Sequence, residues 1–184
     1  MDSRRVAFWA SVAAAASGVV AAALVVRARR IRARAPEVVP FVDIRRYLGK
    51  WYEIARYPNR FQKDDCVATT ATYTQRADGR IDVLNQCHRG GTDGPLQAAR
   101  GVARVADPTT NARLKVTFFW PFAGDYWIID LGPNYEYAVV SEPRRRNLWI
   151  LSRRPALEMQ AFGDILRRLR GQGFDTSKLI YRTG

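Results

Sequence analysis

The sequence is poor in the two residue types that most often build metal sites and reactive centres. Its 184 residues include 2 cysteines and 1 histidine, too few for a zinc site made of Cys and His ligands. A small secreted scaffold held together by many disulfides is excluded for the same reason. His88 is the only histidine that catalysis could use. We therefore expect no metal and no cofactor.

Acidic residues are also scarce: 17 Asp and Glu stand against 30 Lys and Arg, so the formal net charge is +13. Residues 1–35 hold seven arginines and one aspartate, a net +6, which leaves only +7 for residues 36–184. The arginine runs at 144–146, 153–154 and 167–170 come with no sequence signature of a nucleic-acid-binding fold. We expect no nucleic-acid partner, and interpret these runs as a solvated surface or as weakly attracted to anionic lipid headgroups.

A long uncharged run occurs near the N-terminus. Two arginines precede the 21 uncharged residues from Val6 to Val26, and five more arginines follow. As a helix the run would reach about 31 Å, close to the thickness of the hydrocarbon core of a bilayer. Cleaved signal peptides usually have a shorter apolar region. We interpret residues 1–35 as an uncleaved anchor helix; the alternatives are a cleaved signal, a twin-arginine export signal at Ser3-Arg4-Arg5 and a buried soluble helix.

Two prolines follow the basic flank, so residues 36–42 are expected to be an extended linker before a folded domain at residues 43–184. The arginines after the apolar run favour a cytoplasmic domain by the positive-inside rule. The pair of cysteines favours an oxidising compartment instead. We expect the second orientation.

From Phe41 onward the chain alternates short β-prone runs with tight turns. β-branched and aromatic residues dominate these runs, and Asp78-Gly79 between two of them is a strong hairpin signal. We predict eight strands, at residues 51–57, 67–74, 81–87, 101–105, 114–119, 126–131, 135–140 and 148–152.

One helix is predicted after the strands. Pro155 suits its first turn and Gly171 its end. An apolar stripe recurs at helical spacing, at Phe162, Ile165, Leu166 and Leu169. Eight sequential strands with short turns fit an up-and-down barrel, whose closure removes exposed edges and whose outer wall can receive the stripe. A β-sandwich is the alternative on pattern alone.

Three local motifs favour the barrel, because together they resemble the signature of the lipocalin family. Gly49-Lys50-Trp51 opens the first strand as the family's Gly-x-Trp motif does. Asp130 to Tyr135 is similar to the second motif, and Leu148 to Arg153 to the third. Further matches run in order from Asp43 to Tyr181, and the resemblance is strongest to bacterial lipocalins and their apolipoprotein-D-like relatives.

The resemblance implies an all-β fold, an eight-stranded antiparallel up-and-down barrel with one C-terminal helix packed outside. It implies structural roles for Gly49, Trp51, Asp130, Tyr135 and Arg153. In the family the arginine of the third motif lies against the tryptophan of the first. Such a contact between Trp51 and Arg153 needs a closed sheet, and it is worth about 0.5–2 kcal/mol as a cation–π pair.

The resemblance also implies a carrier rather than an enzyme. Bacterial members carry fatty acids or lysophospholipids for membrane maintenance, so the expected partners are a lipid or another small hydrophobic ligand and a membrane, for a monomer or homodimer. Many bacterial members are acylated on a cysteine just after a short signal, but here no cysteine precedes Cys66. The apolar run would then supply the anchor. We expect the barrel in the bacterial cell envelope, at the outer or another membrane, and facing the periplasm.

Side chains alternate between the interior and the exterior along each strand of a barrel. Of the adjacent Tyr126 and Trp127, only one can face inside, and we choose Tyr126. Small inward residues such as Ala103 leave space for a ligand. The predicted ligand contacts are Tyr73, Val83, Asn85, Ala103, Val116, Phe118, Tyr126, Tyr137 and Trp149. Of these, Asn85, Tyr126 and Tyr137 are expected to meet the headgroup of a lipid whose tail lies in an uncharged interior.

Cys66 and Cys87 lie on the two strands joined by the Asp78-Gly79 turn. A two-residue turn would offset them by about four residues, unless a bulge or a longer turn shifts the register. A disulfide and two buried free thiols both remain open, with the disulfide favoured. An enzyme that acts on a bound lipid through Cys66 is an alternative without a second His-bearing motif to support it. A membrane-tethered scaffold without ligand is a further alternative.

Overall fold

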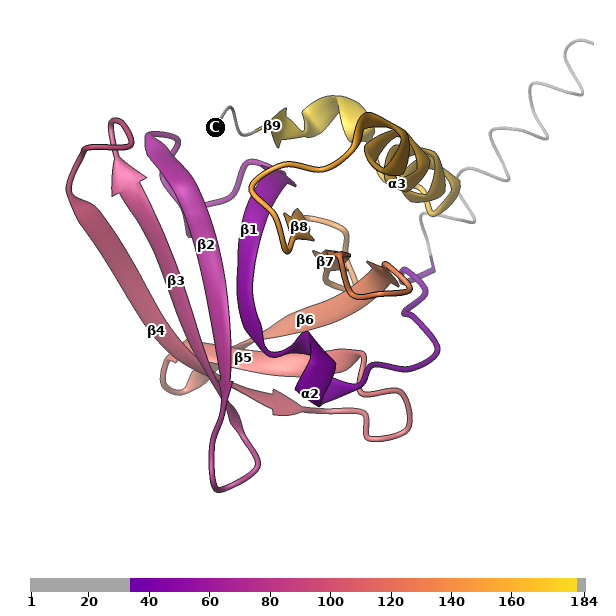
Figure 1. Cartoon of the computed structure of the whole chain (residues 1–184). Helices are drawn as coiled ribbons and strands as arrows, with labels where there is room; N and C mark the ends of the chain where they lie inside the picture. The colour runs from indigo at the N-terminus through magenta and orange to yellow at the C-terminus, as the bar shows by residue number, and fades with distance from the viewer. Residues whose placement is uncertain (1–33, 182–184) are drawn as a thin grey trace, which may run out of the picture. The chain divides into compact units, whose positions relative to one another are not determined.

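The computed structural model describes residues 34–181, which form a closed antiparallel barrel with a helix on its outside (Figure 1). The barrel strands are β1 (Gly49–Arg56), β2 (Cys66–Gln75), β3 (Ile81–Arg89), β4 (Leu96–Val105), β5 (Arg113–Phe119), β6 (Phe122–Leu131), β7 (Tyr137–Ser141) and β8 (Leu148–Ser152). Because β1 pairs with both β2 and β8, the sheet closes. A short strand, β9 (Ile180–Tyr181), also pairs with β1. The predicted eight-stranded barrel is confirmed.

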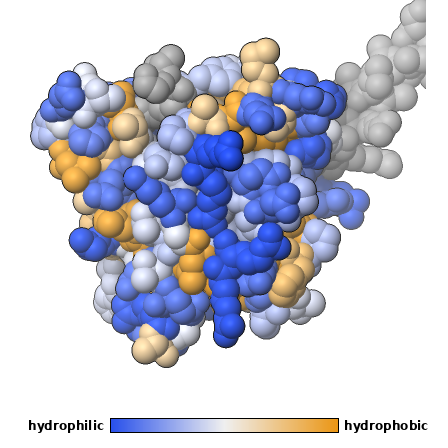
Figure 2. Space-filling view, viewed as in Figure 1, coloured by the Kyte–Doolittle hydropathy of each residue, from blue (hydrophilic) through white to orange (hydrophobic). Residues whose placement is uncertain are grey.

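Alternation along the strands divides the buried apolar residues into two clusters. One fills the barrel interior and includes Trp51, Val83 and Val116. The other, which includes Ile150 and Leu169, lies between the outer wall and α3 (Met159–Gly171). Hydrophilic residues cover most of the face seen in Figure 2, and apolar residues form small separate patches on it. The helix therefore covers an apolar part of the wall, as its stripe predicted.

The start of α3 differs from the one predicted. The helix begins at Met159, four residues after Pro155, and it ends at Gly171, as predicted, with Gln172 as its C-cap. Gly173 then takes a positive φ of 84°. Its N–H donates to the carbonyl of Arg170, and the N–H of Phe174 donates to that of Leu169. This pair of bonds is a Schellman cap, in which Gly173 supplies the left-handed residue that follows the helix.

The segment predicted as a linker, residues 36–42, is extended but packs on the barrel. The N–H of Val39 donates to the carbonyl of Ile128, and Val42 is fully buried. A short helix, α2 (Ile44–Tyr47), follows and is capped by the carboxylate of Asp43. The segment therefore belongs to the folded domain.

The predicted anchor helix lies outside the described residues, which begin at residue 34. Within residues 34–181, neither α2 nor α3 has the length and apolar character needed to cross a bilayer.

One end of the barrel is closed by Trp51 and Arg153. The guanidinium carbon of Arg153 lies 3.8 Å from the centre of the Trp51 ring system, which is fully buried. The guanidinium nitrogens of Arg153 donate to the carbonyls of Lys50 at 3.0 Å, Arg46 at 2.6 Å and Tyr135 at 3.3 Å. Partial burial lowers the pKa of Arg153 from its usual value, although the arginine stays charged. This residue ties four separate parts of the chain to one point.

Close packing at this end explains two more motif residues. Gly49 has a φ of +91°, and a Cβ placed there would lie 3.3 Å from Nη1 of Arg153. Tyr135 has a φ of +62°, its hydroxyl accepts the N–H of Asp43 at 2.8 Å, and the guanidinium of Arg46 lies 4.1 Å from its ring centre. Both residues therefore have structural roles in this structure.

We predict that Trp51→Ala lowers the free energy of unfolding by about 3–5 kcal/mol, because it empties a large buried site. Arg153→Ala should cost less, and the double variant should differ from the sum of the single ones by about 0.5–3 kcal/mol, since the side chains touch. Chemical denaturation of the four proteins measures this coupling. Independent effects would show that the closed end does not depend on the stacked pair.

Candidate ligand-binding site

The barrel interior brings together most of the residues predicted to contact ligand. Asn85 lies two residues after buried Val83 on β3 and therefore shares its inward face. Trp127, by contrast, packs against the helix-side cluster. The predicted contacts that face the interior are Tyr73, Val83, Asn85, Ala103, Val116, Phe118, Tyr126 and Trp149.

The placement of Tyr137 requires a correction, because it lies in the cluster beneath α3. The turn extends further than predicted, so β7 begins only at Tyr137, and Ala138 and Val140 are its inward residues. Arg168 of α3 donates to the Tyr137 hydroxyl at 2.8 Å and to Oδ2 of Asp130 at 2.7 Å. Asp130 and Tyr137 thus connect the helix to the wall, and Tyr137 lies on the helix side of the wall and not on the interior side.

Three tyrosine hydroxyls meet at the inner side of the closed end. The Tyr126 hydroxyl lies 2.7 Å from that of Tyr47 and 2.8 Å from that of Tyr73. Tyr47 comes from α2, so the Tyr126 hydroxyl lies beside the closed end of the barrel. Tyr47 was not predicted, since it precedes the first strand and no periodicity marks it.

These phenols stay protonated over a wide pH range. Burial raises the pKa of Tyr73 to about 12, and it raises the pKa values of Tyr47 and Tyr126 well above the usual value of 10.0. Three hydroxyls carry three hydrogens but share only two hydrogen bonds among themselves. Within residues 34–181 they have no other hydrogen-bond partner. One O–H can therefore donate to an oxygen atom of a ligand.

A buried ion pair lies on the interior side of β1, so the interior is not uncharged as expected. Nε of Arg56 lies 3.4 Å from Oε1 of Glu53, and the two residues are 0% and 6% exposed. Gln62 donates to Glu53 at 3.3 Å and to Thr69 at 2.8 Å. Arg56 also reaches Asp64 of the next loop at 3.2 Å. This polar layer connects the wall to the loop between β1 and β2.

A bulge explains why the sequence did not reveal Arg56. The pairing of β1 with β8 shifts between Glu53 and Ala55, so Ala55 faces the helix-side cluster. Arg56 then pairs with Trp149 and shares its inward face. Strict alternation predicts Glu53 inside but places Arg56 outside.

The wall between β4 and β5 is incomplete. These strands pair only where residues 102–105 face residues 114–117, whereas Leu96 to Gly101 pair with β3 alone. Residues 96–100 are exposed on both faces, and Figure 1 shows β4 diverging from β5. Phe118 lies at the end of the paired part, where a Cβ on Gly101 would come within 2.9 Å of its ring. Phe118 therefore lies where the pairing of β4 with β5 ends, packed against Gly101.

A disulfide joins Cys66 and Cys87, with their α-carbons 5.4 Å apart. The register of β2 with β3 shifts between Val67 and Thr70, where Ala68 takes a positive φ of 49°. This bulge and the turn reduce the offset expected between the cysteines, because Cys66 faces Arg89. The bond closes the end of the hairpin that lies beside the loop carrying Gln62.

A barrel closed at one end around an apolar interior is typical of the small β-barrels that bind ligands. A family model described as a lipocalin-like domain matches residues 42–184. The chain therefore belongs to the lipocalin family.

Relatives of known name cover the same part of the chain. Temperature-induced lipocalin-1 of Arabidopsis thaliana is 40% identical over 151 residues, which span 78% of this chain and 80% of that protein. The outer membrane lipoprotein Blc of Escherichia coli K12 is 41% identical over 148 residues, 80% of this chain and 82% of that protein. The structure of insecticyanin from Manduca sexta is similar with a TM-score of 0.63 at 21% identity, covering 82% and 86% of the two chains, and supports the fold alone.

The tyrosine cluster predicts a loss of stability at high pH. Because folding raises these pKa values above 10.0, the neutral phenols stabilise the fold fully below pH 10, and this contribution is lost as the pH rises toward 12. When the native protein is titrated, the absorbance of phenolate should show a late phase near pH 12. Tyr73→Phe should reduce this phase, whereas Tyr181→Phe, a control at an exposed site, should leave it unchanged. A native titration complete by pH 10 would contradict this.

Proposed function

We propose that the barrel binds and carries a fatty acid or a lysophospholipid, for lipid storage or transport in membrane maintenance. The observation that carries the proposal is the apolar interior, closed at one end by Trp51 and Arg153. The spare tyrosine hydrogen and the Glu53–Arg56 layer add polar groups at two depths, which suits an amphiphile better than a pure hydrocarbon.

The strength of such binding can be bounded. Burying a chain of about 14 carbons could gain roughly 11 kcal/mol at about 0.8 kcal/mol per methylene. Lost translation, rotation and chain flexibility take back several kcal/mol, which leaves a Kd near the micromolar range.

We expect Val116→Arg to abolish lipid binding while the fold survives, because a long charged side chain would occupy the interior next to Ala103. Thr74→Arg, which adds the same charge on the exposed outer face of β2, is the matched control and should retain the Kd. Titration calorimetry with oleate and with lysophosphatidylcholine measures both. Unchanged affinity in a folded Val116→Arg protein would mean that the ligand does not enter the barrel.

A carrier without catalysis fits the state of the cysteines. An enzyme that uses Cys66 needs a free thiolate, whereas here the sulfur is bonded to Cys87. The family relatives bear the names of lipocalins and lipoproteins, which supports binding rather than turnover.

Replacing both cysteines by serine distinguishes a lipid carrier from an enzyme that uses Cys66. The 21-residue separation predicts a loss of about 3 kcal/mol in the free energy of unfolding, on the chain-entropy account of disulfides. The Kd for oleate should change little, since neither sulfur is needed to hold the ligand. Loss of a turnover that the unmodified protein shows on a bound lipid would instead favour the enzyme.

We also propose that the barrel is held at a membrane of the bacterial cell envelope and faces the periplasm. The uncharged run from Val6 to Val26 supports a tether. The Cys66–Cys87 bond supports an oxidising compartment. The similarity to an outer membrane lipoprotein supports the envelope.

A further inference from the structure

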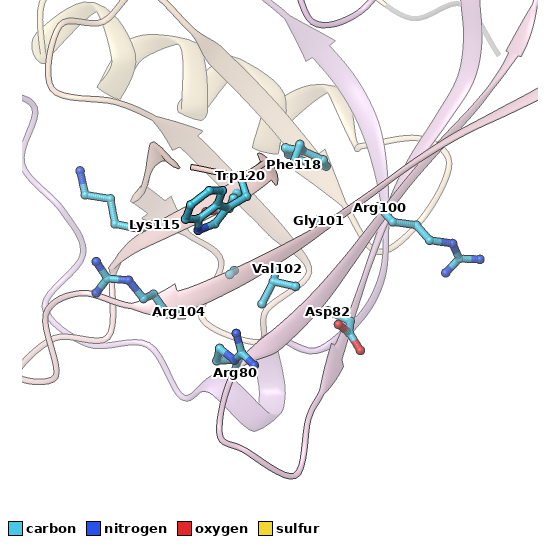
Figure 3. A pocket seen from close by; sticks show the side chains of 11 residues that line it. Arg80, Asp82, Arg100, Gly101, Val102, Arg104, Lys115, Phe118 and Trp120 are labelled. Atoms are coloured by element: carbon cyan, nitrogen blue, oxygen red, sulfur yellow. The ribbon is translucent and has the colours of Figure 1, made fainter. Parts of the chain in front are cut away.

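A hollow of about 430 Å³ lies in the wall of the barrel over β3, β4 and β5, where outward-facing charged residues meet Gly101, Ala103 and Phe118 of the inner face (Figure 3). Its basic and aromatic side chains are Arg80, Arg100, Arg104, Lys115, Phe118 and Trp120. Figure 3 shows Arg104, Lys115 and Trp120 at one side of the hollow.

The charges of the hollow are unbalanced. Asp82 is the one acidic residue that lines it, and Arg76 already pairs with Asp82 at 2.9 Å. Arg100 and Arg104, in contrast, have no acidic partner within 4.0 Å among the residues that the structure describes. The hollow therefore offers two arginines to an external anion.

Pairing across the strands adds to this imbalance. Arg104 lies directly opposite Lys115, and like charges in that position destabilise a sheet. Asp125 neutralises Lys115 at 2.8 Å, which leaves Arg104 without compensation. An anion bound beside Arg104 would supply the missing negative charge, so the arrangement favours an anionic ligand.

An apolar turn lies next to the hollow. Phe119, Trp120 and Phe122, in the turn between β5 and β6, are 79%, 88% and 78% exposed. Strand alternation places this turn at the same end of the barrel as the β1–β2 and β3–β4 connections, where Phe61 and Leu96 are also exposed. Exposed aromatic rings beside cationic side chains are typical of residues at the membrane–water interface.

We propose that this surface docks on an anionic phospholipid bilayer. Trp120 and its neighbouring phenylalanines enter the headgroup region, and Arg100 and Arg104 contact lipid phosphates. Docking in this way places Phe118 and the part of β4 that does not pair with β5 at the membrane surface. The proposal does not require a ligand in the interior, so it stands or fails separately from the proposed function.

The test uses the full chain with vesicles of phosphatidylcholine and about one-third phosphatidylglycerol. The phosphatidylcholine carries bromine on one acyl chain and quenches tryptophan that reaches the bilayer. Subtracting the emission of Trp120→Phe from that of the unmodified protein isolates Trp120. Relative to unbrominated vesicles, we expect its emission to fall by about half, and the effect to weaken in high salt.

Charge reversal tests the basic hollow. Arg100→Glu/Arg104→Glu should abolish the quenching of Trp120, whereas Arg154→Glu/Arg170→Glu, a matched reversal at exposed arginines elsewhere, should retain it. Thermal unfolding checks that each variant folds. Unquenched Trp120 in the unmodified protein overturns the proposal, and so does quenching that persists in the first variant or without phosphatidylglycerol. Concentration-dependent dimers that shield Trp120 from acrylamide without lipid would assign the surface to a second copy instead.

Discussion

The stacking of Arg153 on Trp51 is the contact on which the barrel depends, because it joins the end of the last strand to the first strand. A guanidinium can satisfy several carbonyls in fixed directions while its face lies on a ring. Here the carbonyls belong to Arg46, Lys50 and Tyr135, which lie in three different segments. Strand order, the approach of α2 and the turn before β7 are therefore all constrained at one point.

From that closed end outward, the interior changes in character. Tyrosine hydroxyls lie next to the floor, apolar residues of several strands line the walls, and the Glu53–Arg56 pair lies on the side of the loop after β1. Burying an ion pair costs desolvation, which is offset only when its partners are well placed. Gln62 and Asp64 supply such partners from the loop. The order of that loop and the shape of the interior are thus linked.

Much of this arrangement could be predicted from the sequence, and the exceptions share one cause. Alternation placed Val83, Ala103 and Val116 inside because their strands are regular there. It failed at Arg56, which a bulge turns inward, and at Tyr137, which follows an irregular turn. A single extra residue inverts the faces of all positions after it, and no side-chain pattern marks where the extra residue falls.

The hollow over β3, β4 and β5 could not be predicted from the sequence either, and the reason is a different one. In the sequence, Arg100 and Arg104 look like ordinary solvated arginines. Whether their charges are balanced depends on which residues of β5 lie opposite them. Cross-strand register between β4 and β5 depends on the long turn that joins them and not on any local motif. The same holds for Tyr47, whose position follows from the packing of residues 36–42 on the barrel.

The short pairing of β4 with β5 also exposes a strand edge. Within the described residues, Leu96 to Gly101 offer backbone groups to β3 on one side only. A free edge is a template for pairing with another chain, which leads to aggregation unless charge, proline or brevity prevents it. Pro95 immediately before this edge and Arg100 within it are residues of that protective kind. Pairing of another chain with this edge would lead to fibre formation, and the same arginine that lines the hollow helps to oppose it.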